Sequence, residues 1–218
     1  KEGQHVLDLC SAYGAGLRFL VRNFKVKGHG LDGTQHMHEE AIKRCKRDNM
    51  DGSIELKLGD VTNIPWDNST FDVVWGEDAW CYVTDKDKQI SEAARVLKKG
   101  GTIAFTDWVD GPKGLSDADA ERIERFMKFP YMESQKGYER LLKKHGFTIT
   151  VSDDLTSDFA DHIQLYIDML TKQLSFDALR IINWDMNLMQ AMGGEMMFML
   201  EKARARNFGR TRIVATKK

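Results

Sequence analysis

The 218-residue sequence has few of the residues that tie small folds together, with only three cysteines and three prolines. Cys10, Cys45 and Cys81 are far apart in the chain, and none belongs to a Cys-x-x-Cys pair. A disulfide framework and a zinc site are therefore not expected, and no other metal site is expected either. The cysteines are predicted to be reduced thiols of a cytoplasmic protein.

Long apolar runs and an excess of positive charge are also missing. No stretch reaches the roughly 18 apolar residues that a transmembrane helix requires, so no membrane partner is expected. The 32 basic and 33 acidic residues give a formal net charge of -1. Nucleic-acid-binding surfaces usually show a basic excess, so nucleic acid is not an expected partner.

Short apolar runs of strand length are present, and helical patterns separate the early ones. The predicted strands cover residues 5–10, 27–31, 53–58, 71–75, 102–106, 147–151 and 212–215. Two of the intervening helices are predicted over residues 36–48 and 85–97, and Lys98-Lys99-Gly100-Gly101 is expected to end the second of them. Strands that alternate with helices are typical of an α/β domain with a mostly parallel sheet.

The pattern changes after the fifth predicted strand. Residues 110–145 read as loop, helix, loop, helix, and residues 158–206 read as helical. We interpret both segments as cap elements within one domain of residues 1–218. Five methionines repeat at helical spacing in the second segment and are expected to pack inside the cap or, alternatively, to line an acceptor pocket; they are Met186, Met189, Met192, Met196 and Met199.

Acidic residues and glycines follow the first four predicted strands. A single aspartate at a strand end is most often the N-cap of the next helix. Four such ends in chain order favour a nucleotide site, because ligands of open parallel sheets bind at the carboxyl ends of the strands. The strict Gly-x-Gly-x-x-Gly motif is absent, so a dehydrogenase is not expected.

The motifs LDLCSAYGAG, GLD, GDV, FDVVWGEDAW and ARVLKKGGTIAFTD, in this order, resemble those of class I S-adenosylmethionine-dependent methyltransferases. The resemblance implies a Rossmann-like seven-stranded sheet flanked by helices, with residues 209–217 as the last strand. It also implies S-adenosylmethionine as cofactor and S-adenosylhomocysteine as product. The implied cofactor-binding residues are Asp8, Cys10, Ala12 and Gly14 below the methionine part, Asp32 and Gly33 at the ribose, Asp60 and Val61 at the adenine, and Glu77 beneath the sulfonium.

The first loop departs from the family pattern of acid-x-Gly-x-Gly-x-Gly, because Cys10 and Ala12 replace two glycines. Both residues are small enough for the backbone to approach a ligand closely, but neither adopts positive φ easily. The loop is therefore expected to run with φ below zero at these positions or to carry strain of about 1 kcal/mol or more. We expect it to be a working loop.

The segment Asp78-Ala79-Trp80-Cys81-Tyr82 resembles the D-A-x-x-H motif of the phosphoethanolamine and sarcosine/dimethylglycine N-methyltransferases, with tyrosine in place of histidine. Asp78 and Tyr82 are the predicted catalytic residues: Asp78 attracts a cationic amine, and Tyr82 orients the amine or passes its proton to water. Trp80 and Trp108 are predicted to bind a methylated ammonium through cation–π contacts or, equally, to be packing aromatics. His162 and Tyr166, one helical turn apart, complete the predicted substrate-binding set.

These residues lead to one preferred function and two alternatives. The preferred function is methyl transfer from S-adenosylmethionine to a small molecule, with a small amine as acceptor, by a monomer or homodimer. One alternative is methylation of a hydroxyl, carboxylate or carbon of a bulkier metabolite. The other is a methyltransferase-like module that binds a partner without catalysis.

Overall fold

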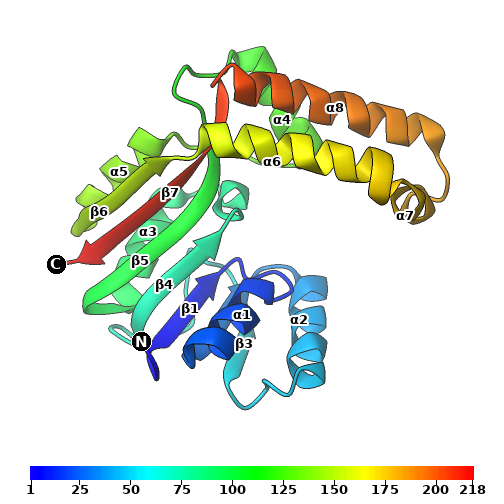
Figure 1. The fold of residues 1–218 in the computed structure, drawn as a ribbon. Coiled ribbons are helices and arrows are strands. Elements are labelled where there is room, and N and C mark those ends of the chain that lie inside the picture. Colours follow the sequence, from blue (N-terminus) through cyan, green and yellow to red (C-terminus); the bar gives the residue numbers. More distant parts are fainter. The chain divides into compact units, whose positions relative to one another are not determined.

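Seven strands form one mixed sheet with the order β3-β2-β1-β4-β5-β7-β6, in which β7 runs opposite to β4 (Figure 1). The computed structural model describes all 218 residues. The strands are β1 (His5–Leu9), β2 (Lys27–Asp32), β3 (Ile54–Leu58), β4 (Phe71–Glu77), β5 (Leu97–Asp110), β6 (Phe147–Asp154) and β7 (Phe208–Lys217). β1 pairs in parallel with β2 and with β4, β2 with β3, and β4 with β5. The predicted α/β sheet is confirmed.

Most predicted strands differ from the observed ones by a few residues at their ends. The exception is β5, which starts at Leu97 and therefore includes the run Lys98-Lys99-Gly100-Gly101 that we expected to end the preceding helix. Gly100 has a φ of 76°, which lets the strand turn within this run. The preceding helix therefore ends at Val96.

Helices cover both faces of the sheet. They are α1 (Ala15–Phe24), α2 (Gln35–Arg47), α3 (Lys86–Val96) and α5 (Gln135–Lys144), and a short 3-10 helix, η1 (Trp80–Tyr82), follows β4. The strand order reverses direction between β1 and β4, so right-handed connections place α1 and α2 on one face and α3 on the other (Figure 1). Leu17 and Val21 of α1 pack on Val6 and Ile54 beneath them.

The chain divides into two compact units. The sheet unit contains residues 1–107, 136–153 and 212–218, and the helical unit contains residues 108–135 and 154–211. The second helix of the predicted cap segment 110–145 is α5, which belongs to the sheet unit with Tyr138 and Leu142 buried. Residues 108–135 of the first predicted cap segment belong to the helical unit, and the assignment of a cap stays a prediction.

The helical unit contains α4 (Asp117–Met127), α6 (Thr156–Asp168), a π-helical turn η2 (Met169–Gln173), α7 (Ser175–Ile181) and α8 (Met186–Arg204). Four rings form its aromatic cluster: Trp108, Phe129, Phe159 and Phe208. Of the methionine stripe on α8, Met199 is buried, whereas Met186 is 62% exposed. Burial of the stripe is therefore greatest at the carboxyl end of α8.

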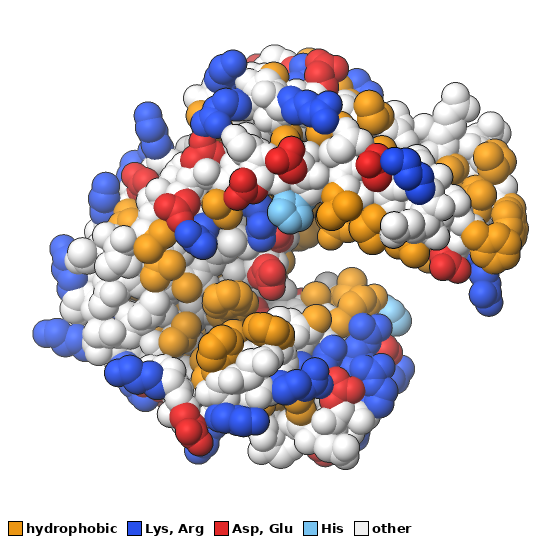
Figure 2. Space-filling model, viewed as in Figure 1, with side chains coloured by type: hydrophobic (Ala, Val, Ile, Leu, Met, Phe, Trp, Pro, Cys, Tyr) orange, Lys and Arg blue, Asp and Glu red, His pale blue; other side chains and the backbone are white.

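Exposed apolar side chains gather where α7 meets α8. Figure 2 shows them at the far end of the helical unit, and they include Phe176, Ile181 and Trp184. No helix of the chain combines the length and the apolar character needed to cross a membrane.

Candidate functional site

A cavity of about 970 Å³ opens at the carboxyl ends of β1, β2 and β3. It brings together six of the nine residues predicted to bind the cofactor: Cys10, Ala12, Asp32, Gly33, Asp60 and Val61. Asp8, Gly14 and Glu77 do not line this cavity; Asp8 is buried in β1, directly before the loop. Three of the four predicted strand ends therefore meet at one cavity, whereas Glu77 at the end of β4 does not line it.

The loop after β1 has the left-handed backbone conformation that glycine favours, although two of its three left-handed residues are not glycine. Cys10 has a φ of 61°, Ala12 of 44° and Gly14 of 66°, so all three lie in the left-handed region. The expectation that Cys10 and Ala12 would keep φ below zero is wrong, and the alternative of a strained loop holds. The replacement of two glycines by Cys10 and Ala12 therefore leaves the backbone of the loop in the left-handed region.

Hydrogen bonds hold this shape from several sides. Asp32 is the central acceptor, since its Oδ2 accepts the Ala12 N–H at 2.8 Å and its Oδ1 accepts the Thr34 N–H at 2.8 Å. Arg18 donates to the Tyr13 carbonyl at 2.6 Å and pairs with Asp48 at 3.0 Å. The carboxylate predicted to bind a ribose thus also fixes the loop beside it.

The cavity is acidic in character. Asp32, Asp60 and Asp85 line it, and none of its lining residues is lysine, arginine or histidine. Beneath the cavity, burial raises the pKa of Asp8 well above its usual value, with further increases from Glu77 and Asp32. Burial also raises the pKa of the Cys10 thiol, so this thiol is protonated at neutral pH. Such a site favours neutral or cationic ligands over anions.

The two predicted catalytic residues are placed differently. Tyr82 lines the cavity and is half exposed, with a pKa raised mainly by burial. Asp78 does not line the cavity; its φ is 52°, and its N–H donates to the Thr106 carbonyl at 2.9 Å. The cavity therefore brings Tyr82 alone of this pair to the predicted cofactor residues.

Trp80 is a packing residue, which contradicts its prediction as a substrate-binding residue. Its side chain is fully buried and stacks on Phe105 at 4.1 Å between ring centroids. Its indole N–H donates to the Leu9 carbonyl at 3.3 Å, directly before the cofactor loop. The ring has no exposed face for a ligand, and instead it connects η1 to the end of β1.

The other predicted substrate-binding residues belong to the helical unit. Trp108 is partly buried in the aromatic cluster, so packing uses much of its ring. His162 and Tyr166 are exposed on α6, and Nδ1 of His162 lies 2.6 Å from the Asp158 carbonyl oxygen. Their assignment as substrate-binding residues stays a prediction.

Sequence reasoning missed several lining residues, namely Thr34, Met37, Leu58, Gly59, Thr62, Ala79, Val83, Thr84 and Asp85. Leu58 and Gly59 directly precede Asp60, so the same strand end signalled them. Thr84 and Asp85 gave no such signal, because a residue before a helix reads as a cap, and Asp85 does cap α3 by accepting the Lys88 N–H.

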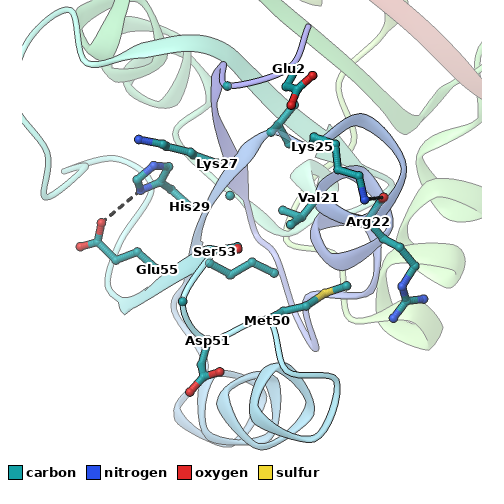
Figure 3. A pocket seen from close by; sticks show the side chains of 15 residues that line it. Glu2, Val21, Arg22, Lys25, Lys27, His29, Met50, Asp51, Ser53 and Glu55 are labelled. Carbon is teal, nitrogen blue, oxygen red and sulfur yellow. Dashed lines mark hydrogen bonds and ion pairs between the residues drawn. The ribbon is translucent and has the colours of Figure 1, made fainter.

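A second cavity, of about 850 Å³, lies at the amino ends of β1, β2 and β3. Figure 3 shows Val21 and Met50 toward its centre, with Lys25, Lys27 and Glu55 around them. None of the predicted site residues lines it. Ligands of open parallel sheets bind at the opposite ends of the strands, so this cavity is not the candidate site.

Comparisons with known proteins agree with the fold. Residues 6–101 match the family model of a methyltransferase domain. The sarcosine/dimethylglycine N-methyltransferase of Halorhodospira halochloris is 28% identical over 161 residues, which cover 72% of this chain and 56% of that protein. Phosphoethanolamine N-methyltransferase 1 of Arabidopsis thaliana is 27% identical over 173 residues, which cover 79% of this chain and 34% of that protein.

Two further matches extend the comparison. Sterol 24-C-methyltransferase of Kluyveromyces lactis is 30% identical over 171 residues, covering 76% of this chain and 46% of that protein. The crystal structure of a Galdieria sulphuraria protein assigned as a sarcosine dimethylglycine methyltransferase has a TM-score of 0.90. It is 24% identical, and the match covers 100% of this chain and 80% of that one.

The chain spans only about a third to just over half of the length of these curated relatives. The matched domain nevertheless begins in β1 and reaches into β5, so it includes all four strand ends of the candidate site. Residues 6–101 therefore match a methyltransferase domain, and the curated relatives over a longer part of the chain are N- and C-methyltransferases.

Proposed function

We propose that the cavity binds S-adenosylmethionine and that the chain catalyses methyl transfer to a small amine. The observation that carries the proposal is the convergence of Asp32, Asp60 and Tyr82 on one acidic cavity. Its volume of about 970 Å³ is ample for a nucleoside with an amino-acid tail. The cofactor supplies an activated methyl group on a sulfonium.

The hydrogen-bonding groups of the cavity fit the cofactor. Asp32 already accepts two backbone N–H groups and has lone pairs left for ribose hydroxyls. Asp60 is exposed at the end of β3, where its carboxylate can accept from an adenine amino group. The Cys10–Gly14 loop brings backbone close to the ligand at the N-terminus of α1.

An amine acceptor agrees with the charge of the cavity. Its carboxylates favour a cationic ligand, and no cationic side chain lines it to repel an ammonium. Tyr82 keeps its proton at neutral pH because its pKa is raised above 10.0. Tyr82 therefore orients the amine through its hydroxyl and does not act as a base, and the amine proton leaves to water.

Two alternatives stay open. The match to a sterol 24-C-methyltransferase favours a carbon acceptor, and the same cavity would then hold the cofactor beside a larger substrate. A module without catalysis is favoured by the altered glycines alone. The retained left-handed loop argues against this second alternative, because a loop without function has no reason to keep strain.

The cofactor half of the proposal is tested by calorimetric titration of the protein with S-adenosylhomocysteine. We expect binding in the micromolar range, and a loss of roughly tenfold to a hundredfold in Asp32→Asn, the range for charge-assisted hydrogen bonds. Asp51→Asn, a carboxylate at the second cavity, is the matched control and should bind like the parent. Unchanged affinity in Asp32→Asn would remove this carboxylate from the site.

The acceptor half is tested by methyl transfer to glycine, sarcosine, dimethylglycine and phosphoethanolamine between pH 7 and 10. An alkylamine has a pKa near ~10, so the rate should rise with pH as free amine becomes available. Tyr82→Phe should lower kcat while sparing cofactor affinity, and Tyr131→Phe serves as control. Methylation of a carbon or hydroxyl acceptor with none of these amines accepted would overturn the amine assignment.

A further inference from the structure

A buried carboxylate lies behind the wall of the cavity that carries Tyr82. Asp107, near the end of β5, has no exposed surface. Its Oδ1 accepts the backbone N–H of Cys81 at 3.0 Å, and its Oδ2 accepts the hydroxyl of Tyr138 at 2.6 Å. Tyr138 is itself fully buried on α5. A carboxylate removed from water at this cost to stability normally has a specific partner to hold.

The partner is the turn that forms the cavity wall. Cys81 is the central residue of η1, and its neighbours Ala79, Tyr82 and Val83 line the cavity. The nearly buried Lys86 donates to the Val83 carbonyl at 2.7 Å, at the other end of the same turn. Two buried charged side chains thus hold η1: Asp107 accepts the Cys81 N–H, and Lys86 donates to the Val83 carbonyl.

Charged and titratable groups face Asp107 from each surrounding element. Lys86 of α3 and the hydrogen bonds from Cys81 and Tyr138 stabilise the carboxylate, whereas Asp78 destabilises it. Cys10, in the cofactor loop, also interacts electrostatically with Asp107. Burial outweighs the stabilising contacts and raises the pKa of Asp107 to about 6.

We propose that Asp107 is the positioning residue of the site: its carboxylate holds η1 so that Tyr82 and Ala79 form the cavity wall, and protonation of Asp107 loosens this wall. The part of this role that concerns the cofactor rests on the proposed function. A neutral Asp107 is a weaker acceptor for Cys81, and it leaves the charge of Lys86 without its nearby carboxylate.

The sign of the pH effect separates positioning from overall stability. Since the pKa of Asp107 is raised above the 3.8 of a free carboxyl, the folded chain binds this proton more readily than the unfolded chain. The contribution of Asp107 to global stability therefore increases as pH falls from neutral through about 6. Protonation of Asp107 therefore does not by itself lower global stability, so a looser η1 that follows this protonation is a local effect.

Hydrogen exchange of the protein alone, read by mass spectrometry over residues 78–84, tests the proposal without any ligand. After correction for intrinsic rates, protection of this segment in the parent should fall about tenfold between pH 7.5 and 5.5. In Asp107→Asn, protection of residues 78–84 should be lower than in the parent at pH 7.5 and should not change with pH. In Asp107→Ala, protection of the same residues should be lower than in Asp107→Asn. Tyr138→Phe removes a hydrogen bond that lowers the pKa of Asp107. In this variant the loss of protection over residues 78–84 should therefore occur at higher pH than in the parent.

Affinity for S-adenosylhomocysteine, measured at the same pH values, supplies the second readout and should follow the protection of η1. Asp87→Asn, a half-exposed carboxylate of α3 paired with Lys144, is the matched control and should behave like the parent. Protection that does not depend on pH in the parent, or a transition unmoved in Tyr138→Phe, would overturn the positioning role. If the exchange results hold but the ligand binds at no pH, the proposed function fails and the positioning of η1 stands.

Discussion

Cys10 and Ala12 hold backbone conformations that most residues avoid. Their φ values of 61° and 44° lie in the left-handed region, which costs an L-residue roughly 1–2 kcal/mol. The hydrogen bond from the Ala12 N–H to Asp32 offsets part of this cost. The shape of the loop is therefore imposed by its surroundings and not by its own residues.

We expect Ala12→Gly to leave the free energy of unfolding unchanged or to raise it by about 1 kcal/mol, because relief of strain is opposed by the greater freedom of glycine in the unfolded chain. Ala94→Gly, inside α3, is the matched control and should lower it by about 1 kcal/mol. Urea unfolding of both variants measures the difference. If Ala12→Gly lowered the free energy of unfolding as much as Ala94→Gly does, the loop would be unstrained.

At the scale of elements, β4 and η1 are joined by a close contact between Gly76 and Trp80. A Cβ at Gly76 would lie 2.2 Å from Nε1 of Trp80, so only glycine leaves room for the indole. The same indole N–H reaches the Leu9 carbonyl at the end of β1. One side chain thus sets the distance between the two loops that form the cavity.

Gly76→Ala should therefore displace Trp80 and lower the free energy of unfolding by about 1–3 kcal/mol, the usual cost of overpacking. Near-ultraviolet circular dichroism and urea unfolding report the two effects. Gly52→Ala is a suitable control, since a Cβ at Gly52 meets nothing within 4 Å, and it should change stability by less than about 0.5 kcal/mol. Equal effects in the two variants would exclude the close contact as the cause.

These two sites also show what the sequence could and could not predict. Asp32 and Asp60 were predictable because an apolar run ending in an acidic residue or glycine is a local signal, and parallel strands bring such ends together. The choice between packing and ligand binding for Trp80 was not predictable, because it depends on the space that Gly76 leaves on another element. Likewise, residue preferences alone favoured negative φ at Cys10 and Ala12, whereas the hydrogen bond from the Ala12 N–H to Asp32 depends on a strand end 20 residues away.

For the whole molecule, exposure differs between the two units. Most of the exposed large apolar side chains belong to the helical unit, among them Phe176 at 63% and Ile181 at 83%. Surface apolar residues of this size favour self-association or partner binding when they are grouped. The expectation of a monomer or homodimer stays a prediction.

Phe176→Ala should lower the free energy of unfolding by less than about 1 kcal/mol, since most of the ring is already in water. Phe208→Ala, at a fully buried position of the same unit, should lower it by about 3–5 kcal/mol. Light scattering at increasing protein concentration should also show less self-association for the double variant Phe176→Ala, Ile181→Ala than for the parent. A large loss of stability from Phe176→Ala would mean that this ring is packed in solution.

The position of β7 in the sheet has a consequence for synthesis on the ribosome. β7 lies between β5 and β6, although both neighbours precede it in the chain, and β6 pairs with no other strand. Until residues 208–217 leave the exit tunnel, β6 has an unpaired edge and β5 lacks one neighbour. Unpaired edges invite wrong pairing between chains, so we expect the sheet to be most exposed to misassembly before residues 208–217 pair with β5 and β6.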